Sequence, residues 1–209
     1  MAPSLFTAEV RSVSPVPSDG WVYSLEIPGP ETFTASHGIV VHNCIPLDPF
    51  YLSWKAREYG IVPKFIELAG EVNTHMPDYV VDKLAGGLNR QGKPVKGSRV
   101  LVLGLAYKKD IDDPRESPAF EVIEKLLHLE AVVSYHDPFI PVAPKMRSWP
   151  DLPELRSIPL DAATVAAQDA VMIVTDHTSV DYDLVMRHAP LIVDTRGVFR
   201  TPSPKVVKA

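Results

Sequence analysis

Apolar and polar residues alternate in four short stretches near the start of the chain, a pattern typical of β-strands with one buried face. These stretches are residues 6–13, 21–27, 32–35 and 39–41. Proline and glycine residues separate them, as turns require. Strands this short do not form a stable sheet alone. The pattern therefore predicts that another polypeptide segment completes this sheet.

The spacing of apolar residues changes to three and four after position 49, which predicts helices over residues 50–59 and 65–88. Pro77 lies inside the second helix, so we expect it either to kink that helix or to start a new one. A helix this long and amphipathic is typical of a spine between domains or of a contact with a second copy.

Short apolar stretches alternate with helical ones from residue 97 to residue 200. Strands are expected over residues 99–105, 132–136, 170–175 and 191–194, and helices over residues 118–129, 161–168 and 182–188. Such alternation implies right-handed crossovers and a parallel sheet covered on both faces. The sequence thus predicts an α/β, Rossmann-like domain over residues 97–209, preceded by a helical segment over 44–96 and a short all-β segment over 1–43.

Composition excludes several classes of protein. The 209 residues carry a formal net charge of −5, and their basic residues are scattered, so we expect no nucleic-acid surface. The single cysteine rules out an intramolecular disulfide and fits a reducing compartment. No stretch resembles a signal peptide or reaches membrane-spanning length. We therefore expect a cytoplasmic protein without a membrane partner.

His42, Asn43 and Cys44 form a junction with its own chemistry. An asparagine side-chain amide can attack its own main-chain carbonyl and release the downstream chain, and a preceding histidine can assist that step. A cysteine thiolate can hold the upstream chain as a thioester. The tripeptide alone could arise by chance in a turn, so the residues before it decide between these interpretations.

Those preceding residues, 4–43, resemble the C-terminal segment of an intein, most clearly at 22–26, 32–36 and 38–41. The resemblance implies that His42, Asn43 and Cys44 carry out protein splicing. Many inteins have aspartate where this chain has Ser24 and histidine where it has Glu31, which bears on the rate and order of the steps. The intein family's N-terminal blocks have no counterpart here. The resemblance therefore implies a separate N-terminal intein–dehydrogenase half as partner, or a truncated precursor.

Five motifs after the junction resemble the UDP-glucose/GDP-mannose dehydrogenase family. They are residues 44–52, 65–73, 102–118, 134–138 and 193–197. The residues in these motifs are most similar to those of the branch that oxidises UDP-N-acetylhexosamines, and UDP-glucose stays open as substrate. The family oxidises the C6 alcohol of a nucleotide sugar to a carboxylate with two NAD. The central helix implies, by the same resemblance, a homo-oligomer.

The resemblance assigns roles to individual residues. Cys44 would capture the aldehyde intermediate as a thiohemiacetal, because a thiolate is strongly nucleophilic. Asp48 would lie on the same helical face and act as base or orient water, with a helix-cap role equally open. Lys108 and Arg196 match positions that contact the UDP-sugar, where a cation offsets anionic charge. Arg115 matches too, and bracing of its loop is an equal alternative.

The sequence shows neither a dinucleotide-binding motif nor a metal-binding pattern. The strand expected over residues 99–105 is not followed by the Gly-x-Gly-x-x-Gly turn that lets a pyrophosphate meet a helix N-terminus. In the family NAD sits on the N-terminal domain, so the resemblance implies that NAD is not bound by this chain. Asp112, Asp113 and Glu116 could suggest a metal cluster, but a solvated loop is the better interpretation, and the scattered histidines predict no metal site.

The sequence favours one function and leaves one alternative. Residues 1–43 would assemble with the other intein half, excise themselves, and join residues 44–209 to an NAD-binding half. The product would be an NAD-dependent nucleotide-sugar 6-dehydrogenase, inactive until splicing. The alternative is a non-catalytic UDP-sugar-binding fragment that carries an inactive intein remnant.

Overall fold

A computed structural model describes residues 32–35, 39–42 and 47–209. The chain divides into two compact units, Met1–Glu67 and Leu68–Ala209. The strands predicted over residues 6–13 and 21–27 lie outside the described residues.

The first unit contains a short hairpin and a helix. Strands β1 (Thr32–Ala35) and β2 (Ile39–His42) pair antiparallel, with Thr32 opposite His42, which confirms the last two predicted strands. Helix α1 (Leu47–Glu58) begins three residues before the predicted start. Lys55 and Glu58 form an ion pair of 2.6 Å on its exposed surface.

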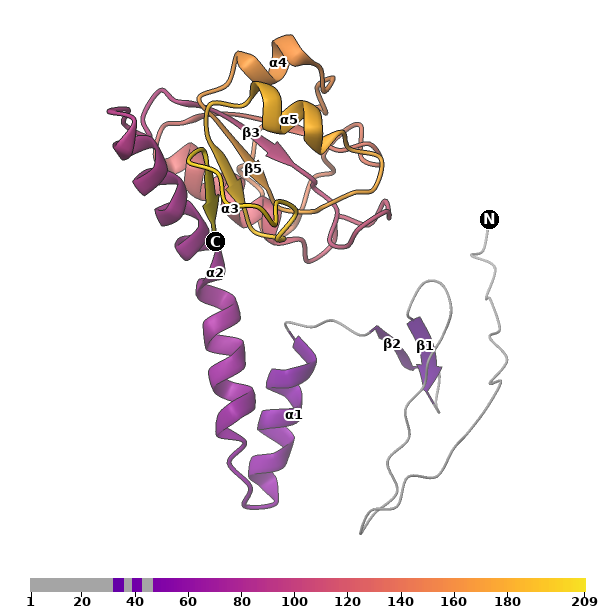
Figure 1. The fold of residues 1–209 in the computed structure, drawn as a ribbon. Coiled ribbons are helices and arrows are strands. Elements are labelled where there is room, and N and C mark those ends of the chain that lie inside the picture. The colour runs from indigo at the N-terminus through magenta and orange to yellow at the C-terminus, as the bar shows by residue number, and fades with distance from the viewer. Residues whose placement is uncertain (1–31, 36–38, 43–46) are drawn as a thin grey trace, which may run out of the picture. The chain divides into compact units, whose positions relative to one another are not determined.

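Helix α2 (Lys64–Arg90) runs through Pro77 without interruption. The prediction of a new helix at this proline is therefore wrong, and the alternative of a kink agrees with the bend of the helix axis (Figure 1). A proline inside a helix has no N–H for the carbonyl one turn earlier, so the helix bends there. The C-terminal part of α2 buries Val80, Val81, Leu84 and Leu88 in the core of the second unit.

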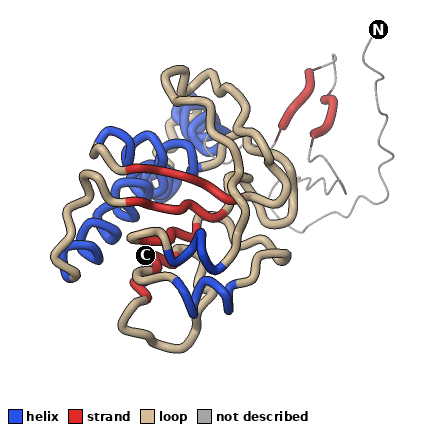
Figure 2. Tube along the Cα trace, turned by 90° about the horizontal axis from the view of Figure 1, so that it is seen from above, coloured by secondary structure: helices blue, strands red, loops and turns tan. Residues whose placement is uncertain are grey.

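The second unit is built on a five-stranded parallel sheet, which confirms the α/β, Rossmann-like prediction. Its strands are β3 (Arg99–Leu103), β4 (Val132–His136), β5 (Ala170–Ile173), β6 (Ile192–Asp194) and β7 (Val206–Lys208). They lie in the order β4-β3-β5-β6-β7. The helices between them are α3 (Pro118–His128), α4 (Ala162–Ala166) and α5 (Tyr182–His188). Figure 2 shows the strands between two groups of helices.

The strands bury both faces, because alternate residues point to opposite sides of a sheet. Val100, Val102 and Met172 pack into a core with α3 and the C-terminal part of α2. Leu101 and Leu103 pack into a second core with α4 and α5. A proline-rich connection over residues 138–159 covers part of the first face, and Trp149 from this connection stacks on Phe120 of α3 at 5.4 Å between ring centroids.

Several element ends differ from the prediction, and helix α4 ends two residues early, at Ala166. Strands β3 and β5 each end two residues early, at Leu103 and Ile173, because Gly104 leaves the extended conformation with φ +87°. The N–H groups of Val174 and Thr175 both donate to the carbonyl of Leu103. Strand β7 was not predicted, because its three residues at the sheet edge are too few to show a period.

Within the described part of the chain, no helix is long and apolar enough to cross a membrane.

Candidate functional site

The carboxyl ends of the strands form the edge of the sheet where a ligand is expected. The chain passes from β3 outward to β4 and then crosses to β5 on the other side of β3. The point between β3 and β5 is therefore a topological switch point, where open α/β sheets bind their ligands. The loops that follow β3, β5 and β6 meet at this edge.

The loops after β3 and β5 pack closely against each other at Gly104 and Thr175. A Cβ on Gly104 would lie 2.4 Å from the carbonyl oxygen of Thr175, and the φ of Gly104 is +87°. The hydroxyl of Thr175 donates to the carbonyl of Ala106 at 2.7 Å. Glycine is therefore required at 104 both by space and by conformation.

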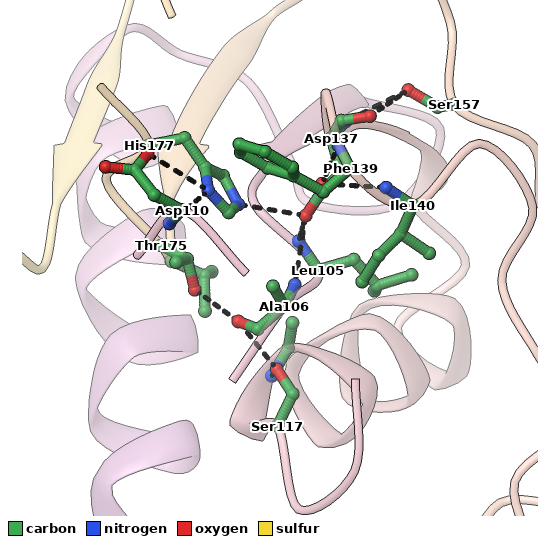
Figure 3. A network of polar contacts seen from close by, with 12 residues as sticks. Leu105, Ala106, Asp110, Ser117, Asp137, Phe139, Ile140, Ser157, Thr175 and His177 are labelled. Atoms are coloured by element: carbon green, nitrogen blue, oxygen red, sulfur yellow. Dashed lines mark hydrogen bonds and ion pairs between the residues drawn. The ribbon is translucent and has the colours of Figure 1, made fainter. Parts of the chain in front are cut away.

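Asp137, directly after β4, is the centre of a buried hydrogen-bond network (Figure 3). Its side chain is fully buried. The donors to it are the N–H groups of Leu105 (2.6 Å), Ala106 (3.0 Å), Phe139 (2.8 Å) and Ile140 (3.0 Å), and Nε2 of His177 (3.1 Å). Burial alone would raise the pKa of Asp137, but the hydrogen bonds from His177 and the backbone outweigh it and lower the pKa to about 2.

This arrangement does not fit the pyrophosphate of NAD. In dinucleotide-binding folds the amides of the turn after the first strand, together with the following helix N-terminus, hold the phosphates. Here the amides of Leu105 and Ala106 both donate to Oδ2 of Asp137. Helix α3 begins only at Pro118, capped by Ser117. Among the described residues of this turn, the carboxylate of Asp137 therefore takes the place that a phosphate would need.

His177 links Asp137 to the far end of the β3 loop. The N–H of Asp110 donates to Nδ1 of His177 at 3.0 Å, so the proton of the imidazole lies on Nε2, which donates to Asp137. The carboxylate of Asp110 accepts hydrogen bonds from the N–H (2.7 Å) and the hydroxyl (2.5 Å) of Thr178. These two bonds are the main cause of a lowered pKa at Asp110.

Lys108 lies exposed in the loop between Ala106 and Asp110. Its contact with the UDP-sugar, which the resemblance implied, stays a prediction. The Nζ of Lys108 is 5.6 Å from the ring centroid of Tyr107, close enough for a cation–π contact. The neighbouring Lys109 forms an ion pair of 3.5 Å with Asp176 in the β5 loop.

Arg196 lies exposed in the loop after β6, and Asp194 organises this loop. The fully buried Asp194 carboxylate accepts from the N–H groups of Arg196, Val198 and Phe199 and from Nζ of Lys208 at 2.6 Å. The Nε of Arg196 donates to the carbonyl of Val174 in the β5 loop. Because Thr175 is bonded to Ala106, the β5 loop joins the loops that carry Lys108 and Arg196.

Arg115 makes a contact of the kind that loop bracing requires, and its alternative role as a ligand contact stays a prediction. Its Nε and Nη2 donate to the two carboxylate oxygens of Asp113 at 2.9 and 2.7 Å.

In the described part of the chain, no group of three His, Cys, Asp or Glu side chains is arranged to hold a metal ion.

The residues of the junction are only partly described. Asn43 and Cys44, with Ser24 and Glu31, lie outside the described residues, and His42 is the last residue of β2. Asp48 is the second residue of α1, inside the first turn rather than at the capping position before it. The suggested pairing of Cys44 with Asp48 stays a prediction.

Sequence reasoning missed the roles of Asp137, His177 and Asp194. A signal was present, because both aspartates stand at the carboxyl end of a predicted strand, where a carboxylate can accept the N–H groups of the following turn.

Comparison with known proteins relates the α/β unit to a family of nucleotide-sugar enzymes. Residues 101–201 match the UDP binding domain of the UDP-glucose/GDP-mannose dehydrogenase family. A UDP-N-acetyl-D-glucosamine 6-dehydrogenase of Salmonella typhi is 31% identical over 131 residues, which make up 62% of this chain and 31% of the relative. A UDP-N-acetyl-D-mannosamine dehydrogenase of Pyrococcus horikoshii is 30% identical over 167 residues, 77% of this chain and 35% of the relative.

Solved structures agree with these matches. The structure of the UDP-D-ManNAc dehydrogenase from Pyrococcus horikoshii has a TM-score of 0.62 at 26% identity, covering 79% of this chain and 37% of that one. A UDP-glucose dehydrogenase from Pyrobaculum islandicum has a TM-score of 0.60 at 26% identity, covering 79% and 36%. The α/β unit therefore has the fold and sequence pattern of the family's UDP-binding domain. The chain spans about a third of the length of these curated relatives.

Proposed function

Because residues 101–201 match the UDP-binding domain of the UDP-glucose/GDP-mannose dehydrogenase family, we propose that this chain is the UDP-sugar-binding part of an NAD-dependent nucleotide-sugar 6-dehydrogenase. One observation carries the proposal. Lys108 and Arg196 lie in two loops at the carboxyl edge of the sheet, and each of these loops is hydrogen-bonded to the β5 loop beside the switch point. Two cations at one edge offset the charge of a diphosphate.

A UDP-N-acetylhexosamine is the preferred substrate class. Relatives with 30% or more identity include dehydrogenases of UDP-N-acetyl-D-glucosamine and UDP-N-acetyl-D-mannosamine. UDP-glucose is the alternative, because the Pyrobaculum islandicum enzyme has nearly the same structural similarity.

The chemical roles of the remaining residues follow from the resemblance. Cys44 is the proposed nucleophile, whose thiolate adds to the carbonyl carbon of a sugar aldehyde. Asp48 is the proposed base or water-orienting group beside it. We assign NAD binding to polypeptide outside this chain, because Asp137 already takes the amides of Leu105 and Ala106.

The UDP site is tested by removing its cations one at a time. We expect Lys108→Ala and Arg196→Ala each to weaken UDP binding by the full chain about tenfold, because each removes a charge-assisted contact. Isothermal titration calorimetry with UDP measures this effect. Lys96→Ala is the matched control, because Lys96 is an exposed lysine before β3, paired with Glu130 at 2.7 Å. If all three variants bind UDP as tightly as the unsubstituted chain, Lys108 and Arg196 do not form the UDP site, and the proposal is contradicted.

We also propose that residues 1–43 splice the chain to a partner that carries the other intein half. Support comes from the sequence of the junction and from the position of Cys44, which would be both the first residue after the intein and the dehydrogenase nucleophile. The thiolate of Cys44 would first take the incoming chain as a thioester, displacing the other intein half. Cyclisation of Asn43 would then break the Asn43–Cys44 peptide bond, and the freed amine of Cys44 would take the acyl group from its own sulfur to form the amide.

Splicing predicts a specific peptide. In cells that produce the chain, mass spectrometry should find the peptide that begins at Cys44 joined to residues other than His42 and Asn43. We expect Asn43→Ala to abolish that peptide, because alanine has no side-chain amide to cyclise. Finding only intact residues 42–44 in the unsubstituted protein would contradict splicing and favour a non-catalytic UDP-sugar-binding fragment with an inactive intein remnant.

We further propose that the protein is a homo-oligomer through α2. Leu68, Val72, Met76 and Tyr79 recur at helical spacing, and each is between 38% and 54% exposed. A stripe of this kind is typical of a surface that another helix covers. Light scattering on the full chain should give at least a dimer, and a monomer mass at micromolar concentration would contradict the proposal.

A further inference from the structure

The loop that carries Lys108 is held at both of its ends. At its beginning, the N–H groups of Leu105 and Ala106 donate to Oδ2 of Asp137 at 2.6 and 3.0 Å. At its end, the N–H of Asp110 donates to Nδ1 of His177 at 3.0 Å. Lys108 therefore projects from a short segment whose two ends are both fixed.

One imidazole ring connects these two ends. His177 is fully buried, its Nε2 donates to the same Oδ2 of Asp137 at 3.1 Å, and its Nδ1 accepts from Asp110 (Figure 3). The ring of Phe139 lies 5.0 Å from the imidazole between centroids and packs against it. Both ring nitrogens are thus used, and a side chain with one polar atom could not replace them.

Asp110 locks the end of the loop to the β5 loop. Its φ is +60°, a conformation that a non-glycine residue adopts only when its surroundings hold it there. Its carboxylate accepts from the N–H and the hydroxyl of Thr178, which follows His177 directly. We call Asp110, Asp137, His177 and Thr178 the loop clamp.

We propose that His177 is a positioning residue for UDP, acting through the loop clamp to hold the backbone that presents Lys108. The inference rests on the proposed function, and it assigns a task to a buried histidine that the proposed chemistry does not use. A backbone that is already ordered loses less conformational entropy when the ligand binds, so the clamp raises the affinity for UDP.

The experiment separates the clamp from general stability. His177→Phe removes both ring nitrogens, and Asp110→Gly removes the side chain with its carboxylate, at a backbone conformation that glycine accepts. Glu130→Gly is the matched control, because Glu130 is also exposed, has a φ of +59°, and follows α3 at the opposite edge of the sheet. Asp110→Asn is the conservative variant, because asparagine tolerates this conformation and keeps one acceptor oxygen.

Two measurements on the full chain are compared. Amide hydrogen exchange of residues 105–110, without ligand, should be faster in His177→Phe and Asp110→Gly than in the unsubstituted chain, and unchanged in Glu130→Gly. Calorimetry with UDP should show affinity about tenfold weaker in the first two variants, partial recovery in Asp110→Asn, and no change in Glu130→Gly.

Each outcome decides a separate question. Unchanged exchange in Asp110→Gly would overturn the clamp itself. Faster exchange with unchanged UDP affinity would leave a structural clamp and overturn its positioning role. If the unsubstituted chain binds no UDP, the proposed function fails and the positioning role fails with it, whereas the exchange measurement still shows whether the loop is clamped.

Discussion

Replacement of Asp137 by alanine is expected to lower the free energy of unfolding by about 4 kcal/mol, because five buried donors lose their acceptor at once. These donors come from three separate segments, which the carboxylate holds together. The loss can prevent folding altogether, since it approaches the whole stability of an ordinary domain. Urea unfolding followed by circular dichroism measures it.

Asp161→Ala is the control for this prediction. Asp161 also accepts a backbone N–H, from Thr164 at 2.7 Å, but it lies at the exposed N-terminus of the short helix α4. Its loss should cost only about 1 kcal/mol. Similar destabilisation by the two substitutions would show that the buried network contributes no more than a helix cap.

The same carboxylate predicts the direction of a pH effect. The pKa of Asp137 is about 2 in the folded protein, below the value near 4 of an unfolded aspartate. Its contribution is therefore complete above pH 4 and is lost as the pH falls toward 2, and it amounts to about 2 to 3 kcal/mol. The stability gap between the unsubstituted chain and Asp137→Asn should narrow over that pH window. A gap that stays constant from pH 6 to pH 2 would contradict the lowered pKa.

Gly104→Ala is expected to cost about 4 kcal/mol, because two penalties add. The new methyl group would lie 2.4 Å from the Thr175 carbonyl oxygen and 2.8 Å from its Cα, and backbone atoms cannot move away as a flexible side chain can. The φ of +87° adds the strain of a left-handed conformation. Because Thr175 is bonded to Ala106, UDP affinity should fall as well.

Gly97→Ala separates the two penalties. Gly97 has a similar φ of +77°, and a Cβ there would meet nothing within 4 Å. It should therefore cost only the conformational strain, about 1 kcal/mol. Thermal unfolding of both variants in the same buffer gives the comparison. If Gly104→Ala is no worse than Gly97→Ala, the two loops do not pack as closely as described.

The α/β unit could be predicted from sequence because its strands and helices have clear periods. Strand β4 and helix α5 begin and end at the predicted residues, since apolar stretches end there at polar or proline residues. The ends of β3 and β5 could not be predicted, because they depend on a contact between Gly104 and Thr175, 71 positions apart in the chain. Pairing at that distance leaves no local pattern.

The candidate site was predictable in part. The family motifs singled out Lys108 and Arg196 as candidate site residues, and both lie at the carboxyl edge of the sheet. The loop clamp could not be predicted, because the bonds of Asp137 and His177 join three separate stretches of the chain, around residues 105–110, 137–140 and 177. A histidine after a strand carries no sign of which nitrogen accepts and which donates until its partners are placed.

Strand β7 has a practical consequence for anyone who wishes to shorten this protein. The family match ends at residue 201, so the natural choice of a minimal domain would omit residues 206–208. That cut would remove Lys208 from Asp194 and leave β6, with its buried Ile192 and Val193, as a bare edge strand. Exposed apolar edge strands pair with one another and aggregate. A soluble minimal domain should therefore retain the C-terminal residues through Ala209.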